Sequence, residues 1–265
     1  MFLVLICSLV YSLHAFPLPV KLVDMTHTFD ETVIHYPFVN GFQMETEMNG
    51  TELNGVWILT EKYSSSIHVG THMDAPLHFI PDGLAVDQIP INHFFAPAAV
   101  IDITEKAELD PDAEVTVEDL LNWECLTEQS LNGTIVLLKS GWGKRWNDEI
   151  AFLGTSDGHL SNSHFPGFSA EAAIFLVQNR TIYGVGTDTI SFDKGSSKTF
   201  PAHQILLRHG IFGLENVANV EQIPIYGAQL YVMPMKIGKA SGAPTRIIAS
   251  YIAPKIVQDI PSSKK

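Results

Sequence analysis

The stretch "SSSIHVGTHMDAPLHF", residues 64–79, gathers three histidines and an aspartate into eleven positions: His68, His72, Asp74 and His78. All four positions are even, so a straight strand would place them on one face. A strand rises about 3.3 Å per residue, which would hold His68 and His72 roughly 13 Å apart, too far to bind one ion. On a helix the same pair would meet, at about 5–6 Å between Cβ atoms. The chemistry of this stretch therefore depends on how its backbone runs.

Gly70 and Pro76 interrupt the stretch and indicate its path. Both residues disfavour a continuous helix. A glycine can adopt backbone angles that other residues avoid, and it lets the chain pass close to a ligand. We therefore predict a sharply bent segment, with Gly70 at the bend and Pro76 fixing the exit, that draws the four polar side chains together.

Imidazole and carboxylate ligands suit Zn or Mn, and no thiolate lies nearby to build a closed structural zinc site. An open site keeps positions for water and substrate, and a bound divalent ion can lower the pKa of its water to about 7. His78 could then carry protons. The alternative is that these histidines are ordinary surface or hydrogen-bonded core groups. Their clustering around Gly70 and Pro76 favours the metal site.

The composition limits the class of protein. The chain has 265 residues, 46% of them hydrophobic, which fits one globular domain or at most two small ones. Its formal net charge of −13 argues against nucleic acid or an anionic membrane as a partner. No internal repeat, low-complexity segment or linker divides the sequence.

The N-terminus, "MFLVLICSLVYSLHAFPLP", is apolar, uncharged and closed by prolines. It is short for a membrane span and typical of a signal peptide. We expect cleavage after Ala15, which gives a signal peptide over residues 1–15 and a mature domain over residues 16–265. The protein would be secreted and free of the membrane. A buried first strand and a membrane anchor are the alternatives.

Three Asn-x-Ser/Thr triplets agree with export: Asn49, Asn132 and Asn179. The cysteines are Cys7, in the expected signal, and Cys125. No intrachain disulfide is then available after cleavage. We expect Cys125 to be a buried apolar side chain.

The remaining pattern indicates an α/β class with mixed strand direction and leaves the topology open. Thr116 and Ser169 precede helical patterns as N-caps, and Gly210 closes a third helix. The predicted strands cover residues 20–26, 55–63, 98–104, 133–142, 182–189 and 229–237, and the predicted helices residues 116–126, 169–179 and 202–210.

The motif "HVGTHMDAPLHF" resembles the signature of the cyclase-like metal hydrolases, which include the bacterial-type kynurenine formamidases and a relative, isatin hydrolase. Further blocks resemble the family in family order, across residues 21–251. They are "KLVDMTHTF", "PLHFIPDGLAVDQIP", "GTIVLLKSGW", "FPGFSAEAAIFL", "GVGTDTISFD" and "PAHQILLRHGIFGLENVAN".

The resemblance implies a single domain with a mixed β-sheet and packed helices, called a swivelling β/α/β arrangement, that forms a homodimer or homotetramer. It implies one or two Zn or Mn ions, with Asp74 as the bridge where there are two. It makes His78 the general acid/base. The ligands that it implies are His68, His72, Asp74, His203 and Glu215.

The function implied is a secreted metal-dependent amidohydrolase that cleaves an N-formyl or cyclic amide, similar to an arylformamidase. The type-case formamidases are cytosolic, so export makes a role in tryptophan degradation doubtful and leaves the substrate open. One alternative is an isatin-type cyclic amide hydrolase, and another is a non-catalytic secreted binding protein on the same fold. A complete set of ligands favours an enzyme.

Some other residues have two interpretations. His27 and His164 could line a pocket or serve as structural histidines, and Trp142 could line an aromatic pocket or pack in the core. No nucleophile-elbow pattern indicates serine hydrolysis. Hydrogen bonds that support a metal ligand could come from Thr187, Asp188 and Ser191. Asp188 could instead cap a turn.

Overall fold

The computed structural model describes residues 20–52, 54–155, 157, 159 and 162–253. The expected signal peptide lies outside these residues. The strands are β1 (Val20–Asp24), β2 (Gln43–Thr51), β3 (Trp57–Ser64), β4 (His72–Asp74), β5 (Phe95–Asp102), β6 (Glu114–Val115), β7 (Ile135–Lys139), β8 (Gly167–Phe168), β9 (Gly184–Thr187), β10 (Phe212–Glu215), β11 (Gln229–Pro234) and β12 (Gly242–Ile252). The α-helices are α1 (Thr104–Leu109), α2 (Val117–Thr127), α3 (Glu149–Leu153), α4 (Ala170–Asn179) and α5 (Pro201–Arg208).

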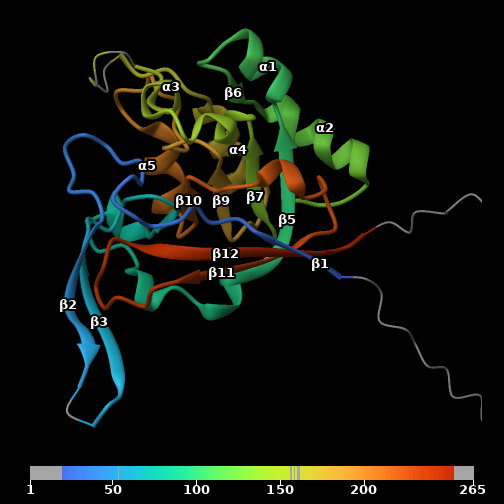
Figure 1. Ribbon diagram of the computed structural model, residues 1–265. Coiled ribbons are helices and arrows are strands. Elements are labelled where there is room, and N and C mark those ends of the chain that lie inside the picture. The colour runs from blue at the N-terminus through green and yellow to red at the C-terminus, as the bar shows by residue number, and fades with distance from the viewer. Residues whose placement is uncertain (1–19, 53, 156, 158, 160–161, 254–265) are drawn as a thin grey trace, which may run out of the picture.

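The main sheet closes on itself. Its strand order is β1-β12-β11-β5-β7-β9-β10-β4, and β4 also pairs with β12, which completes a ring of seven strands with β1 outside it. The pairs from β5 through β10 are parallel, and the other pairs are antiparallel. The helices lie beside the parallel strands (Figure 1). The mixed α/β class is thus confirmed, and the closure of the sheet into a barrel is a feature that the sequence analysis left open.

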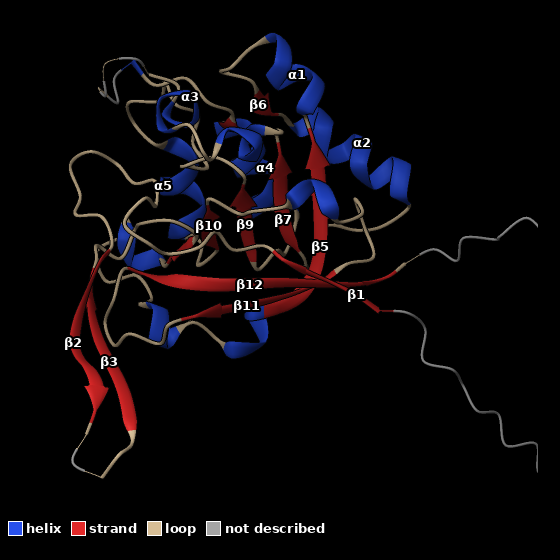
Figure 2. Cartoon of the chain, viewed as in Figure 1, coloured by secondary structure: helices blue, strands red, loops and turns tan. Residues whose placement is uncertain are grey.

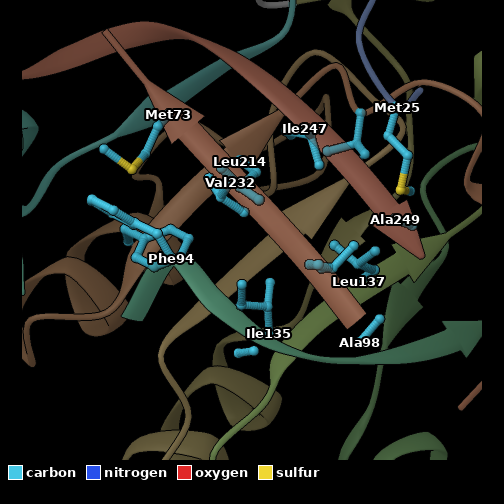
Figure 3. Close-up of a cluster of buried hydrophobic side chains, with 14 of the residues drawn as sticks. Met25, Met73, Phe94, Ala98, Ile135, Leu137, Leu214, Val232, Ile247 and Ala249 are labelled. Atoms are coloured by element: carbon cyan, nitrogen blue, oxygen red, sulfur yellow. The ribbon is translucent and has the colours of Figure 1, made fainter. Parts of the chain in front are cut away.

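Strand β7 shows how the chain builds two cores from one sheet. Its first four residues are apolar and buried, and successive side chains point to opposite faces. Ile135 and Leu137 join the cluster inside the barrel, with Met73, Leu214 and others in Figure 3. Val136 and Leu138 join the cluster under the helices. A continuous apolar run therefore suits a strand that is covered on both faces.

The two predicted N-caps are present, whereas α5 ends at Arg208, two residues before the predicted Gly210. Thr116 accepts a hydrogen bond from the Asp119 backbone N–H at 3.3 Å, and Ser169 accepts one from the Ala172 N–H at 3.0 Å. Helix α5 begins at Pro201, a favoured first position. No helix in the described part of the chain combines the length and apolar character needed to cross a bilayer.

Strands β2 and β3 pair only with each other and project from the barrel as a ribbon (Figures 1 and 2). The strand expected over residues 55–63 is therefore correct as an element, but it lies outside the core and is mostly exposed.

The expectation for Cys125 is wrong, because this side chain is exposed. Helix α2 buries Leu120, Trp123 and Thr127, which share one stripe at helical spacing, and position 125 falls off that stripe.

Candidate metal centre

The bend predicted at Gly70 is present, and the segment that carries the site begins there. Gly70 has φ +57°, and a Cβ added there would lie 2.7 Å from Val33 Cγ2. Glycine is thus required by both conformation and space. Three residues of strand β4 follow, and then a 3-10 helix, η1 (Pro76–His78), begins at the predicted proline. The bend separates His68 from β4, and η1 turns His78 back toward it.

The barrel places the other members of the site. His72 and Asp74 lie on one face of β4, while Met73 points the other way into the barrel core. Glu215 is the register partner of His72 on β10. Paired residues on adjacent strands have Cβ atoms about 4.5–5.5 Å apart. The sheet itself therefore brings two residues 143 positions apart into contact.

Helix α5 supplies His203, and four side chains then converge. His72 Nε2 lies 3.3 Å from both Asp74 Oδ1 and Glu215 Oε2. His203 Nε2 lies 3.3 Å from Asp74 Oδ2 and 3.2 Å from Glu215 Oε1. All four residues are buried. Two imidazole nitrogens and two carboxylates thus face one another around a single point.

His68 and His78 complete the cluster on its open side. His68 Nδ1 is 2.7 Å from Asp74 Oδ1, and His78 Nε2 is 3.9 Å from Asp74 Oδ2. The two rings stack with centroids 3.9 Å apart. The ligand atoms of His68, Asp74 and His78 lie within 4.8 Å of one another, as do those of His72, Asp74 and Glu215. All six residues named from the sequence are brought together, and Asp74 is common to both groups.

The donor set fits a divalent cation. His72 Nδ1 donates to the Gly70 carbonyl at 2.9 Å, which leaves Nε2 as the atom with a free lone pair. Nε2 of His72 and Oδ2 of Asp74 are buried and have no hydrogen-bond partner. Such groups are costly to bury unless they bind a cation. Nitrogen and oxygen ligands without sulfur favour Zn or Mn.

The pKa shifts of His72 and His78 show where the site stabilises a positive charge. Burial disfavours the His72 imidazolium, but the carboxylates of Asp74 and Glu215, each 3.3 Å from Nε2, outweigh burial and raise its pKa to about 10. The pKa of His78 is lowered, mainly by burial and partly by the neighbouring His68 and His203. The inner site therefore favours a cation, while His78 favours the neutral ring that accepts a proton.

Asp193, which the sequence analysis did not select, orients His203. Its Oδ2 is 2.6 Å from His203 Nδ1 and accepts the His203 backbone N–H at 3.0 Å. Its Oδ1 accepts the Ala202 N–H at 2.9 Å. The carboxylate thus binds the first turn of α5 and the imidazole together, and it directs Nε2 into the site. An aspartate ten positions before a histidine gives no sequence signal of this contact.

Asp188, which was considered for this supporting role, instead binds a turn: it accepts hydrogen bonds from the backbone N–H groups of Ser140 and Trp142 at 3.1 and 3.0 Å. Trp142 is a core residue, buried with Phe152. Thr187 bonds Thr189, 2.5 Å between hydroxyl oxygens.

The other two histidines differ from each other. His27 stacks on Trp146 at 3.7 Å between centroids, and its backbone N–H donates to Thr71 Oγ1, beside His72. His164 pairs with Asp112 at 2.7 Å and is half exposed. Ser191 accepts the backbone N–H of Asp193 at 3.3 Å, so it contacts the residue that orients His203.

Comparisons with known proteins find similarity to hydrolases. An isatin hydrolase of Roseibium aggregatum is 35% identical over 191 residues, which are 69% of this chain and 71% of that protein. A kynurenine formamidase of Bacillus cytotoxicus is 28% identical over 230 residues, 85% of this chain and 95% of its own. The solved structure of isatin hydrolase A from Labrenzia aggregata bound to benzyl benzoate superposes with a TM-score of 0.80 and 33% identity, covering 88% of this chain and 94% of that one.

The family model described as "Putative cyclase" matches residues 23–194. This range contains β4, η1 and four of the six clustered side chains. The match spans more than half of the chain and agrees with the resemblance found in the sequence. The chain therefore belongs to the cyclase family.

Proposed function

We propose that this chain is a metal-dependent amidohydrolase whose substrate is an anilide, either an N-formyl arylamine or a cyclic amide fused to a benzene ring. The observation that carries the proposal is the buried ring of His72, Asp74, His203 and Glu215, which leaves acceptor atoms without partners. The relatives are named isatin hydrolase and kynurenine formamidase, and both isatin and the N-formyl derivative of kynurenine are anilides. In each reaction water adds to the carbonyl, the C–N bond breaks, and the products are a carboxylate and an aryl amine.

The ring would hold the cation through the Nε2 atoms of His72 and His203 and through the two carboxylates, with His68 on the open side. A divalent cation in that position supplies a polarised carbonyl and a water of lowered pKa. The chain supplies the rest. Asp193 holds the tautomer of His203, and the Gly70 carbonyl holds that of His72.

His78 is proposed as the proton carrier. It lies farther from Asp74 than the inner histidines do, and 30% of its side chain is exposed. Its lowered pKa keeps the ring neutral near pH 7, ready to take a proton from water. The same ring then protonates the departing nitrogen, which allows the amine to leave.

The test is hydrolysis by the purified chain, loaded with Zn or Mn, of three substrates: N-formylkynurenine, formanilide and isatin. We expect at least one anilide to be opened by loaded protein and none by protein stripped with a chelator. Loaded protein that opens none of them would favour the non-catalytic alternative.

Export stays a further proposal. Asn49, Asn132 and Asn179 are exposed, as glycan acceptors must be. A secretory cell should release the chain with an N-terminus near Phe16 and a mass that falls on glycosidase treatment. An intact Met1 on protein kept in the cytosol would contradict it. Assembly into a homodimer or homotetramer also stays a prediction.

A further inference from the structure

Of the six side chains that form the metal centre, all of them described in the structure, only His68 and His78 are exposed to solvent. His72, Asp74, His203 and Glu215 are buried, whereas His68 and His78 are 21% and 30% exposed at their side chains. A substrate must therefore approach beside the His68–His78 stack. Residues that border this stack are the ones that a substrate meets.

Two phenylalanines border it. The Phe79 ring lies 4.8 Å from His78 and 4.6 Å from His203, measured between centroids. The Phe200 ring lies 5.7 Å from Phe79 and 5.9 Å from His203. Phe200 is 37% exposed, so part of its ring is free to contact a ligand. The entrance thus has an aromatic wall next to the proposed proton carrier.

The backbone of Phe200 is unusual. It adopts φ +48° and ψ 55°, the left-handed region, directly before Pro201 and the first turn of α5. A bulky side chain there is a genuine outlier, and strained positions of this kind cluster at active sites and ligand-binding segments. Its N–H donates to Ser197 Oγ at 3.2 Å, and its carbonyl accepts the Gln204 N–H at 3.1 Å. The fold therefore holds an exposed aromatic ring at the entrance in a conformation that glycine would adopt more easily.

We propose that Phe200, with Phe79 behind it, binds the aromatic ring of the substrate at the entrance of the metal centre and so selects anilides over alkyl amides. This inference rests on the proposed amidohydrolase function. Offset or edge-to-face contact with an aryl group adds to simple burial, which gives the wall a preference for aromatic ligands. An aryl group bound there would lie close to His78, whose ring is 4.8 Å from that of Phe79.

Phe200→Gly separates recognition from folding. Glycine removes the left-handed strain together with the ring, so the Tm of the variant should be no lower than that of the parent. Its kcat/KM for formanilide should fall about 10- to 100-fold, and that for N-methylformamide should change little. Phe95→Ala is the matched control, because Phe95 is 45% exposed and packs against Tyr231 on a different part of the barrel. Phe95→Ala should leave both values unchanged.

A ligand-binding measurement tests the role of Phe200 even if the chain does not hydrolyse an anilide. Calorimetry on metal-loaded protein compares benzoate with acetate, which share a carboxylate and differ in the ring. Phe200→Gly should weaken benzoate about 10- to 100-fold and leave acetate unchanged. Equal benzoate affinity in parent and variant, no benzoate binding by the parent, loss of both ligands, or a clearly lower Tm would each overturn the role of Phe200. Absence of anilide hydrolysis by the parent, with benzoate binding as expected, would refute only the proposed reaction.

Discussion

Asp193→Asn tests whether the geometry of the metal centre depends on a residue that touches no ion. In the parent, three N–H donors from Ala202 and His203 meet the two carboxylate oxygens at 2.6 to 3.0 Å. An amide has one oxygen, so whichever way it turns, its NH2 group meets at least one N–H. His203 also loses the negative charge that fixes its tautomer.

The expected magnitude follows from that contact. Loss of a group that orients a metal-binding histidine typically lowers metal affinity about 10- to 100-fold. This range corresponds to ~1.4–2.8 kcal/mol of binding free energy. The buried N–H left without a partner should lower the unfolding free energy of metal-free protein by about 1–3 kcal/mol.

Asp188→Asn is the matched control. Asp188 is 5% exposed and Asp193 is 1% exposed, and Asp188 also accepts several N–H and O–H groups, but from Ser140 and Trp142. Both variants should lose similar stability in urea unfolding. Competition with a chelator should show weaker Zn binding for Asp193→Asn alone. Equal affinity in the two variants would refute the orienting role of Asp193.

Three further predictions concern the proton carrier, pH and the bend. His78→Ala should keep its metal and lose about 10²–10⁴-fold in turnover, whereas His72→Ala should lose both metal and turnover. Metal analysis and kinetics distinguish the two variants, and equal metal loss in both would make His78 a ligand. The pKa of His72 is about 10 in the folded chain and about 6.5 in an unfolded one. Its contribution to stability is therefore complete below pH 6.5 and is lost as pH rises through 10, so the urea midpoint of metal-free protein should fall between pH 7 and 10; a flat profile would contradict this. Gly70→Ala should cost about 1–3 kcal/mol of unfolding free energy and weaken metal binding, because its φ is +57° and Val33 occupies the Cβ position, whereas Gly50→Ala has open space and should be neutral.

The local features of the site could be predicted because local sequence determines them. Gly70 and Pro76 specify the bend and the start of η1 through their own backbone preferences. Thr116 and Ser169 specify helix starts in the same way. His203 and Glu215 had no such signal and were named through the family resemblance.

The remaining features depend on contacts between distant segments. Closure of the barrel requires β4 to pair with β12, about 170 positions away, and no local pattern encodes that pairing. The β2 sequence "QMETEMNGT" is polar and was not predicted as a strand, so the exposed ribbon that it forms with β3 was missed. The role of Asp193 depends on the fold that brings its loop to α5.

The central claim is that the four buried side chains hold a divalent cation. Elemental analysis of protein purified from metal-replete medium tests it most directly, with the double variant His72→Ala/Glu215→Gln as the control. We predict one or two equivalents of Zn or Mn per chain in the folded parent. The control should lose the equivalent that the four buried side chains hold. Folded parent protein that contains no metal, or a control that retains as much as the parent, would contradict the account.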